Sequence, residues 1–406
     1  MATARHVIVA GAGIAGLTAS LALARAGFRI TLFEQAEKLK EVGAGIQLGP
    51  NATRVLIALG LREPLAAAAM APRAIRVMAG GSGREIVRIP LGEHVERRYG
   101  APYWVIHRGD LQAVLANAAL AHPDITLRLR SRVEDFAIHA SGVTVQGHGG
   151  GQVIDERGMA LIGADGVWSA LRKRLGRQRP ARFAHRTAWR ALLPPEAVPP
   201  DFREPLVHLW LGPDAHLVHY PVKNGRLINI VGIVRDDWKD TGWNAVGQRA
   251  DILRHFARWA WDDSARDLIA TPERWVKWAL YARRHPFRGG SGPVTLIGDA
   301  AHPMLPFLAQ GAGMAIEDAA VLADMLATYG DDVTDALRGY EGARRRRTLH
   351  AQRASRRQAH IYGLSGPEVL VRNMVMRVMG GERLLSRYNW LYSWRPPDIP
   401  KASSPS

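Results

Sequence analysis

The feature that most constrains the fold is a glycine-rich turn, GAGIAG at residues 11–16, which lies between two regular patterns. The preceding HVIVA is a continuous apolar run typical of a buried strand, and the following LTASLALARAG has helical character. A second apolar run, FRITLFE, ends at Glu34. In a strand–turn–helix–strand unit of this kind, the glycines allow a tight turn, close approach of a diphosphate and close helix packing. The pattern therefore predicts a dinucleotide-binding unit.

The diphosphate is expected at the N-terminus of the first helix, where free N–H groups and the helix dipole favour anions. Glu34 follows Gly11 by 23 residues, and its carboxylate can accept hydrogen bonds from ribose hydroxyls while disfavouring a 2'-phosphate. A purely structural glycine turn would explain the glycines but not Glu34. The candidate residues of this unit are Gly11, Gly13, Ile14, Ala15, Gly16 and Glu34.

Two later stretches also place glycines and an aspartate after a short apolar strand. The first, ALIGADGVWSALRKRL at residues 160–175, contains Asp165, and the second, GDAAHPMLPFLAQGAG at residues 298–313, contains Asp299. A turn that only connects two elements needs about two to six residues, so the second stretch is long enough to indicate a binding role.

Together, the three stretches resemble the three fingerprints of the group A flavoprotein aromatic hydroxylases, the family built like para-hydroxybenzoate hydroxylase. The resemblance covers roughly residues 5–330. It implies FAD as the cofactor, NADH as co-substrate with NADPH as the alternative, and O2 as the oxidant. It also implies an α/β fold with a Rossmann-like FAD-binding domain, an inserted antiparallel β-sheet substrate domain and C-terminal helices.

The expected domain division follows from this resemblance. Residues 1–180 would form the first part of the FAD-binding domain, residues 181–288 the substrate-binding sheet, residues 289–365 the second part of the FAD-binding domain, and residues 366–406 a helical tail.

The resemblance also implies which residues contact the flavin. Asp299 would accept from a ribityl hydroxyl, and Pro306 with its neighbouring glycines would let the backbone lie flat against the ring. The stretch at residues 41–61 resembles the family's loop that crosses the flavin, which makes Asn51 a near neighbour or only a helix cap. Asp165 would organise the flavin domain or cap the next helix, and Arg108 would contact the flavin or form a surface salt bridge. The positions implied are Gln47, Arg108, Asp165, Asp299, Pro306, Gly311, Ala312 and Gly313.

From about residue 187 the sequence changes to alternating strands separated by turn signals, which predicts an antiparallel sheet; the tryptophan-rich residues 252–278 are expected to be helical. In AHLVHYPV, His216 and Tyr220 share one face because side chains alternate along a strand. This His-x-x-x-Tyr resembles the active-site strand of family members that hydroxylate small hydroxylated aromatic acids. His216 would then help to deprotonate the phenol, a task that suits a near-neutral pKa, and Tyr220 would position the ring or its carboxylate. Two aromatic side chains packed in a sheet core are the alternative.

Gln310 matches a polar position of the same relatives, and its amide can bind a carboxylate or a phenol. The leading expectation is therefore hydroxylation of 3-hydroxybenzoate to gentisate. Hydroxylation of salicylate to catechol, or of 6-hydroxynicotinate, is the alternative within the family. A flavin dehydrogenation, or a nucleotide-binding interaction protein with a basic tail, would be a different function.

Composition limits the other classes. A chain of 406 residues with 47% hydrophobic and 22% charged residues is expected to form two globular domains. It has no cysteine, and no metal site is expected. The net charge is +17, and its densest basic run, residues 343–357, lacks interleaved aromatics, so we expect a solvated or subunit-facing helix and no nucleic acid. Glycine, serine and threonine interrupt the apolar run at residues 7–24, so no membrane span is expected. The protein is expected to be cytoplasmic, with a homodimer as one arrangement.

Overall fold

The computed structural model describes residues 5–39, 44–149, 151–176, 180–240, 242, 245–257, 259–283, 287, 289–329 and 332–397. Parts of three expected features lie outside this described part of the chain. They are the start of the flavin-crossing loop at residues 41–43, the end of the inserted sheet domain at residue 288, and the end of the tail at residues 398–406.

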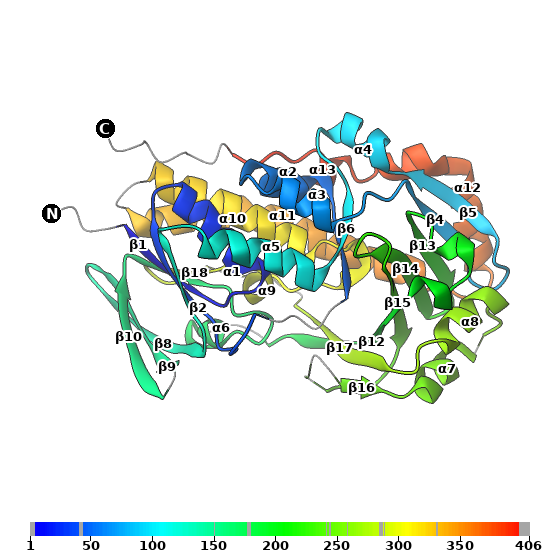
Figure 1. Ribbon diagram of the computed structural model, residues 1–406, viewed down its shortest axis with the longest axis horizontal. Coiled ribbons are helices and arrows are strands. Elements are labelled where there is room, and N and C mark those ends of the chain that lie inside the picture. The colour runs from blue at the N-terminus through cyan, green and yellow to red at the C-terminus, as the bar shows by residue number, and fades with distance from the viewer. Residues whose placement is uncertain are drawn as a thin grey trace.

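A parallel five-stranded sheet forms one end of the molecule, with the strand order β18-β11-β1-β2-β7 (Figure 1). All five residues of HVIVA are buried, as expected for a strand that is covered on both faces. Because the strands are parallel, the glycine turn and the two aspartate stretches begin at the same edge of the sheet. The strands are β1 (His6–Ala10), β2 (Arg29–Phe33), β7 (Ile125–Arg128), β11 (Ala160–Gly163) and β18 (Val294–Leu296).

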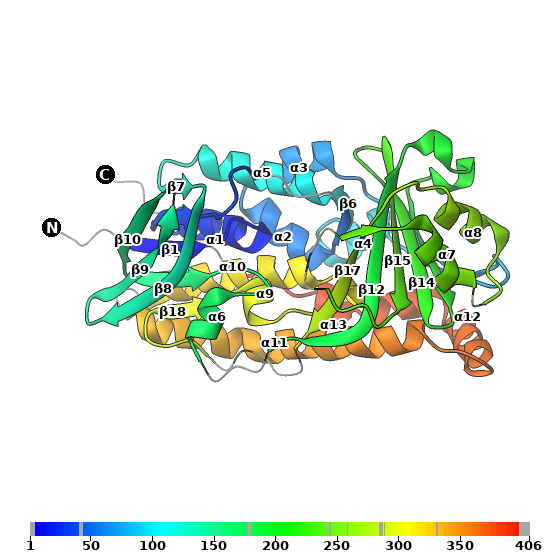
Figure 2. The same ribbon diagram turned by 90° about the horizontal axis from the view of Figure 1, so that it is seen from below.

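Two different layers cover this sheet. Helices pack on one face around Val7, Ile30 and Ile162, whereas an antiparallel three-stranded sheet packs on the other face around Ile8 and Leu161 (Figures 1 and 2). The covering helices are α1 (Ile14–Arg25), α2 (Pro50–Ala58), α3 (Arg62–Ala68), α5 (Arg108–Leu120), α10 (Gly311–Thr328) and α11 (Val333–Tyr362). The covering strands are β8 (Ser131–His139), β9 (Gly142–Gly149) and β10 (Gln152–Gly158).

An eight-stranded sheet forms the other end of the molecule, in the order β16-β17-β12-β15-β14-β13-β4-β5 (Figure 2). All of its neighbouring pairs are antiparallel except β13 with β4. Its strands are β4 (Ala74–Ala79), β5 (Glu85–Pro90), β12 (Arg182–Leu193), β13 (Leu206–Gly212), β14 (Ala215–Val222), β15 (Leu227–Arg235), β16 (Ala245–Gly247) and β17 (Trp275–Ala282). Strands β4 and β5 come from the segment expected to belong to the first part of the FAD-binding domain, and the domain division stays a prediction.

Helices α7 (Arg249–Ala257) and α8 (Asp263–Ala270) cover the outer face of this sheet, where they pack on Trp189 and Leu217. The expectation that residues 252–278 are helical is wrong for the last part of that segment, because Trp275 begins strand β17. The mixed α/β class, with a parallel nucleotide-binding sheet, an antiparallel second sheet and C-terminal helices, is confirmed.

The longest helix, α11, runs along the molecule from the parallel sheet to the antiparallel one (Figure 2). No helix within the described ranges is both long and apolar enough to cross a bilayer. The remaining elements are β3 (Gly45–Leu48), β6 (Trp104–His107), α4 (Gly92–Tyr99), α6 (Ala170–Arg174), α9 (Gly298–Ala301), α12 (Glu368–Ser386), α13 (Asn389–Tyr392), and the 3-10 turns η1 (Pro195–Ala197), η2 (Pro200–Phe202) and η3 (Pro306–Leu308).

Candidate active site

The glycine turn after β1 closes tightly against its neighbours. Gly11 has a φ of 105°, which favours glycine, and its N–H donates to the carbonyl of Phe33 at 2.7 Å. A Cβ at Gly16 would lie 1.8 Å from the carbonyl oxygen of Gly11, so a larger residue would push the helix away from the turn. These two glycines therefore serve the geometry of the turn, as the sequence pattern predicts.

A cavity of about 330 Å³ lies beside this edge of the sheet. The first residues of α1, α5 and α10 all line it, so three helix N-termini, with their partial positive charges, meet there. The sequence-predicted residues that line this cavity are Gly13, Ile14, Ala15, Gln47, Arg108, His216, Tyr220, Asp299, Pro306, Gly311 and Ala312.

The glycines at these helix starts leave room for a ligand. A Cβ at Gly13 would meet no heavy atom of the described residues within 4 Å, and a Cβ at Gly311 would meet only a carboxylate oxygen of Asp299 at 4.0 Å. Exposed backbone at two helix N-termini suits a diphosphate, and the carboxylate beside them suits a polyol hydroxyl. The residues present therefore fit FAD.

Six predicted residues lie outside this lining: Gly11, Gly16, Glu34, Asp165, Gln310 and Gly313. Glu34 accepts from the N–H of Ala12 at 2.8 Å and from that of Ala36 at 2.9 Å, so it braces the glycine turn. Asp165 accepts from the N–H of Leu171 at 3.2 Å, which is the helix-capping role that the sequence left open. Direct contact of Glu34 and Asp165 with the cofactor stays a prediction.

Asp299 is the acidic residue of the cavity wall. Burial raises the pKa of this carboxyl, and the charges of His302 and Arg108 act in the opposite direction. A hydrogen-bond donor from a ligand would stabilise the ionised form further.

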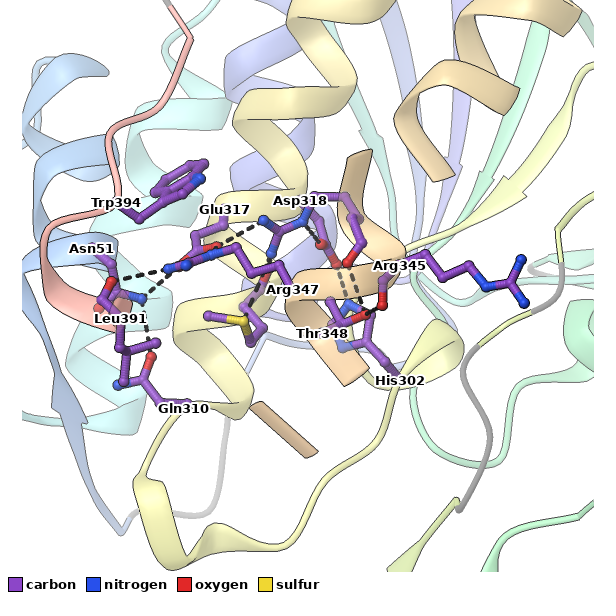
Figure 3. A network of polar contacts seen from close by, with 12 residues as sticks. Asn51, His302, Gln310, Glu317, Asp318, Arg345, Arg347, Thr348, Leu391 and Trp394 are labelled. Carbon is purple, nitrogen blue, oxygen red and sulfur yellow. Dashed lines mark hydrogen bonds and ion pairs between the residues drawn. The ribbon is translucent and has the colours of Figure 1, made fainter. Parts of the chain in front are cut away.

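The bend after β18 is held from behind by Asp318 of α10 (Figure 3). One oxygen of Asp318 accepts from the N–H of Gly298 at 2.9 Å and lies 2.5 Å from Nε2 of His302. Its other oxygen accepts from Nε of Arg344 at 2.7 Å. Burial alone would raise the pKa of Asp318, but His302 and Arg344 bring it below its usual value. The bend is therefore fixed to an ionised, buried carboxylate.

The neighbouring Glu317 connects the other side of this network (Figure 3). It is fully buried and accepts from Arg344 and Arg347 of α11 and from the side-chain amide of Asn51, each at 2.7 Å. The same amide nitrogen of Asn51 donates to Oε1 of Gln310 at 3.0 Å. Gln310 is thus directed into the network, and its contact with a substrate stays a prediction.

The expectation of a solvated or subunit-facing basic helix is therefore wrong for part of the run. Arg344 is only 3% exposed, and Arg347 also donates to the carbonyls of Trp390 and Leu391 at 2.9 Å. These two arginines join α11 to α10 and to the C-terminal segment.

The antiparallel sheet forms the opposite wall of the site. His216 and Tyr220 of β14 lie on its inner face, as their spacing predicts, and both line the cavity described above. A second cavity of about 850 Å³ extends from there towards α11 and α12. The residues that line both cavities are Gln47, His216, Val218, Pro306 and Ala309, so the two spaces meet beside His216.

His216 is electrically neutral in this surrounding. Burial, assisted by the charge of Arg186, lowers its pKa to about 3, which differs from the near-neutral value expected from the sequence. Its ring centroid lies 5.2 Å from those of Phe307 and Tyr362. A neutral imidazole can accept a hydrogen bond from a phenol, and a phenolate beside it would raise its pKa again.

Tyr220 remains protonated at physiological pH. Burial raises the pKa of its hydroxyl, while the charge of Arg190 and a hydrogen bond to Gln47 act against this shift. Gln47 also accepts from the hydroxyl of Tyr103 at 2.5 Å. Strand β3, which carries Gln47, is thereby connected to Tyr220 of β14, and its passage across the flavin stays a prediction.

Sequence reasoning missed several of these residues. Glu317 and Asp318 gave no signal because a buried acid looks like a surface acid in sequence. Arg190 and Trp278 also line the cavity, and strand alternation in TAWRALLP could have placed Arg190 on the inner face. Within the described ranges, no group of three or more His, Cys, Asp or Glu residues is arranged to hold a metal ion.

Comparisons with known proteins agree with this geometry. Residues 4–357 match the FAD_binding_3 model, described as an FAD binding domain. The chain is 34% identical to a 3-hydroxybenzoate 6-hydroxylase of Klebsiella oxytoca, over 97% of this chain and 98% of that protein. It is 37% identical to the 3-amino-4-hydroxybenzoate 2-monooxygenase PtmB3 of Streptomyces platensis, over 96% of both chains.

The fold is similar to that of HpxO from Klebsiella pneumoniae, whose crystal structure contains FAD and uric acid. The TM-score is 0.82 at 26% sequence identity, covering 94% of this chain and 95% of HpxO. Together, the cofactor cavity, the family match and these relatives show that the chain belongs to the FAD-binding family of flavoprotein aromatic hydroxylases and is an FAD-dependent monooxygenase that uses NAD(P)H.

Proposed function

We propose that this enzyme hydroxylates 3-hydroxybenzoate to gentisate with NADH as the electron donor. One observation carries the proposal: His216 and Tyr220 line the same cavity as the residues that fit FAD, so a small ring between them would face the cofactor. The similarity to 3-hydroxybenzoate 6-hydroxylase over nearly the whole chain supports the choice of substrate.

The balanced reaction consumes one substrate, NADH, H⁺ and O2, and it yields gentisate, NAD⁺ and water. FAD, when bound, would pass electrons from NADH to O2 and so activate one oxygen atom of O2 for transfer to the ring. The chain's own residues must orient the ring, exclude water and raise its electron density.

His216 would raise the electron density of the ring. Its neutral imidazole accepts a hydrogen bond from the phenol, and the phenolate that forms is stabilised as the imidazole gains the proton. Negative charge on the phenolic oxygen increases electron density at the para carbon, which is the position hydroxylated to give gentisate. Tyr220 would hold the ring, since its hydroxyl is a hydrogen-bond donor at every physiological pH.

The test is a panel of hydroxybenzoates supplied to the FAD-loaded protein, with NADH and oxygen consumption and products measured together. We expect 3-hydroxybenzoate to stimulate NADH oxidation and to yield gentisate that contains one atom from labelled O2. His216→Asn should couple less of the NADH to product. Product formation without label, or no response to any hydroxybenzoate, would contradict the proposal.

A second candidate substrate is 3-amino-4-hydroxybenzoate, because the PtmB3 protein reaches 37% identity. It belongs in the same panel, beside salicylate and 6-hydroxynicotinate, and its product would carry the new hydroxyl next to the carboxyl group. The domain boundaries, a cytoplasmic location and a homodimer stay predictions from the sequence.

A further inference from the structure

One cationic side chain lies on the substrate wall of the cofactor cavity. Arg190 belongs to β12, in which Trp189 packs into the outer core and Arg190 lies on the opposite, inner face. The charged residues that line this cavity within the described part of the chain are Arg108, Arg190 and Asp299. Arg108 begins helix α5 on the cofactor side, where its charge opposes the rise in the pKa of the buried Asp299. Among the described residues that line the cavity, Arg190 is therefore the cation contributed by the antiparallel sheet.

Its guanidinium is held in a defined orientation. The central carbon lies 3.8 Å from the centre of the Trp278 ring, and that ring is 8% exposed on the neighbouring strand β17. Stacking of this kind uses the face of the guanidinium, whereas carboxylates bind to its in-plane N–H groups. The indole thus orders the arginine without using the geometry that recognises an anion.

The register of the sheet places Arg190 beside the two predicted substrate residues. Arg190 pairs with Val231 of β15, and Val231 pairs with Val218 of β14. Val218 lies between His216 and Tyr220 on the inner face of its strand. The backbones of Arg190 and Val218 are therefore separated by two strand spacings, about 10 Å. A long arginine side chain and a small aromatic acid together can span this distance.

A second observation concerns the electrostatic effect of Arg190 on Tyr220. The charge of Arg190 acts against the rise in the pKa of the buried Tyr220 hydroxyl. An anion near Tyr220 would experience the same field, in a site where burial weakens screening by solvent.

We propose that Arg190 binds the ring carboxylate of the substrate and so selects aromatic acids over their neutral analogues. This inference rests on the proposed function and deepens it. Arg190 forms the charge-assisted contact with the carboxylate, His216 receives the phenol at the other end of the ring, and Tyr220 supports the ring between them. Arg190 is thus a specificity residue that contacts the substrate.

The experiment compares two ligands that differ in charge but little in shape. The dissociation constants of 3-hydroxybenzoate and of neutral 3-hydroxybenzamide are measured by titrating FAD-loaded protein and following the flavin absorbance. In Arg190→Gln we expect binding of the acid to weaken about 10- to 100-fold, as typical for loss of a charged hydrogen bond, and binding of the amide to change less than about 3-fold. Arg190→Lys should give an intermediate ratio, because it retains the charge but not the planar fork.

Lys277→Gln is the matched control. Lys277 is a half-buried cation on β17, next to Trp278 in sequence, and its Nζ lies 4.4 Å from the Trp238 ring centre and 5.0 Å from that of Trp189, on the outer face. Its replacement removes a similar stacked cation and should leave the acid-to-amide ratio unchanged.

FAD content measured for every variant separates misfolding from lost recognition. Equal weakening of acid and amide in both Arg190 variants, or no weakening of the acid, would overturn the role of Arg190 and leave the wild-type product assay untouched. If the wild-type protein binds no aromatic acid at all, both this inference and the proposed function fail.

Discussion

Removal of the Arg344 side-chain charge should destabilise the whole enzyme. Arg344 is 3% exposed and donates to Glu317 and Asp318, both fully buried, at 2.7 Å. In Arg344→Met, the side chain keeps much of its volume, but Asp318 loses its guanidinium partner and Glu317 loses one of its two arginine partners. Breaking a buried ion pair on one side typically costs about 3 to 5 kcal/mol, because a buried charge remains without compensation.

The expected change in melting temperature follows from the size of the chain. An unfolding entropy of about 2.1 cal/mol/K per residue gives about 0.85 kcal/mol/K for 406 residues. A loss of about 3 to 5 kcal/mol therefore corresponds to a decrease of roughly 4 to 6 °C. Calorimetry of wild type and variant at one fixed, saturating FAD concentration measures this difference.

Arg345→Met is the control for this prediction. Arg345 is the next residue of the same helix, but it is exposed, and its side chain points away from the network (Figure 3). This substitution should shift the melting temperature by less than about 1 °C, as surface substitutions usually do. If the two variants have the same melting temperature, the buried network of Arg344, Glu317 and Asp318 does not stabilise the protein.

Three further predictions concern the site. Gly13→Ala should fold normally yet bind FAD at least about 10-fold more weakly, whereas Gly16→Ala should lower the melting temperature itself; flavin titration and calorimetry of both variants check this contrast. Because the pKa of His216 is about 3, its imidazole is neutral above that pH and loses its acceptor role only below it, so the pH profile of kcat/KM should lack an acidic limb near 6.5. A limb at that pH that disappears in His216→Asn would contradict this assignment. Tyr103→Phe should cost about 1 to 3 kcal/mol in urea unfolding, since it leaves Gln47 without its 2.5 Å donor; an unchanged midpoint would show that another donor replaces it.

The cofactor half of the site could be predicted because its signals are local. A glycine with positive φ, a helix start and an acid at the end of a strand follow one another within about 25 residues, in the spacing typical of a dinucleotide-binding unit. His216 and Tyr220 were found for a similar reason, since the two-residue period of a strand fixes which side chains share a face.

Long-range partners could not be read in the same way. Strands β4 and β5 join the antiparallel sheet through β13, more than 100 residues later in the chain, and nothing in their own sequence specifies that partner. Strand β17 was expected to be helical because a short, buried, tryptophan-rich run has no clear period.

The basic run shows the same limit for charges. Composition indicates an exposed helix, yet Arg344 precedes the buried Thr348, Ala351, Ser355 and Ala359 at helical spacing. That spacing places Arg344 on the buried face of the helix. Only the structure reveals that it donates hydrogen bonds to Glu317 and Asp318. Arg190 was missed for a related reason: strand alternation could have placed it on the inner face, but a single arginine in a strand does not indicate a ligand.

The parallel sheet sets a limit on how this enzyme can be divided or recombined. Its edge strand β18 begins at Val294, after the whole inserted sheet, and pairs with β11, so a fragment ending near residue 180 would leave β11 as an open edge. Helix α1 would also lose its packing against α10. Such a fragment is expected to aggregate rather than fold. Transfer of a foreign substrate layer into this scaffold therefore requires grafting β4 and β5 together with the insertion, in an otherwise intact chain.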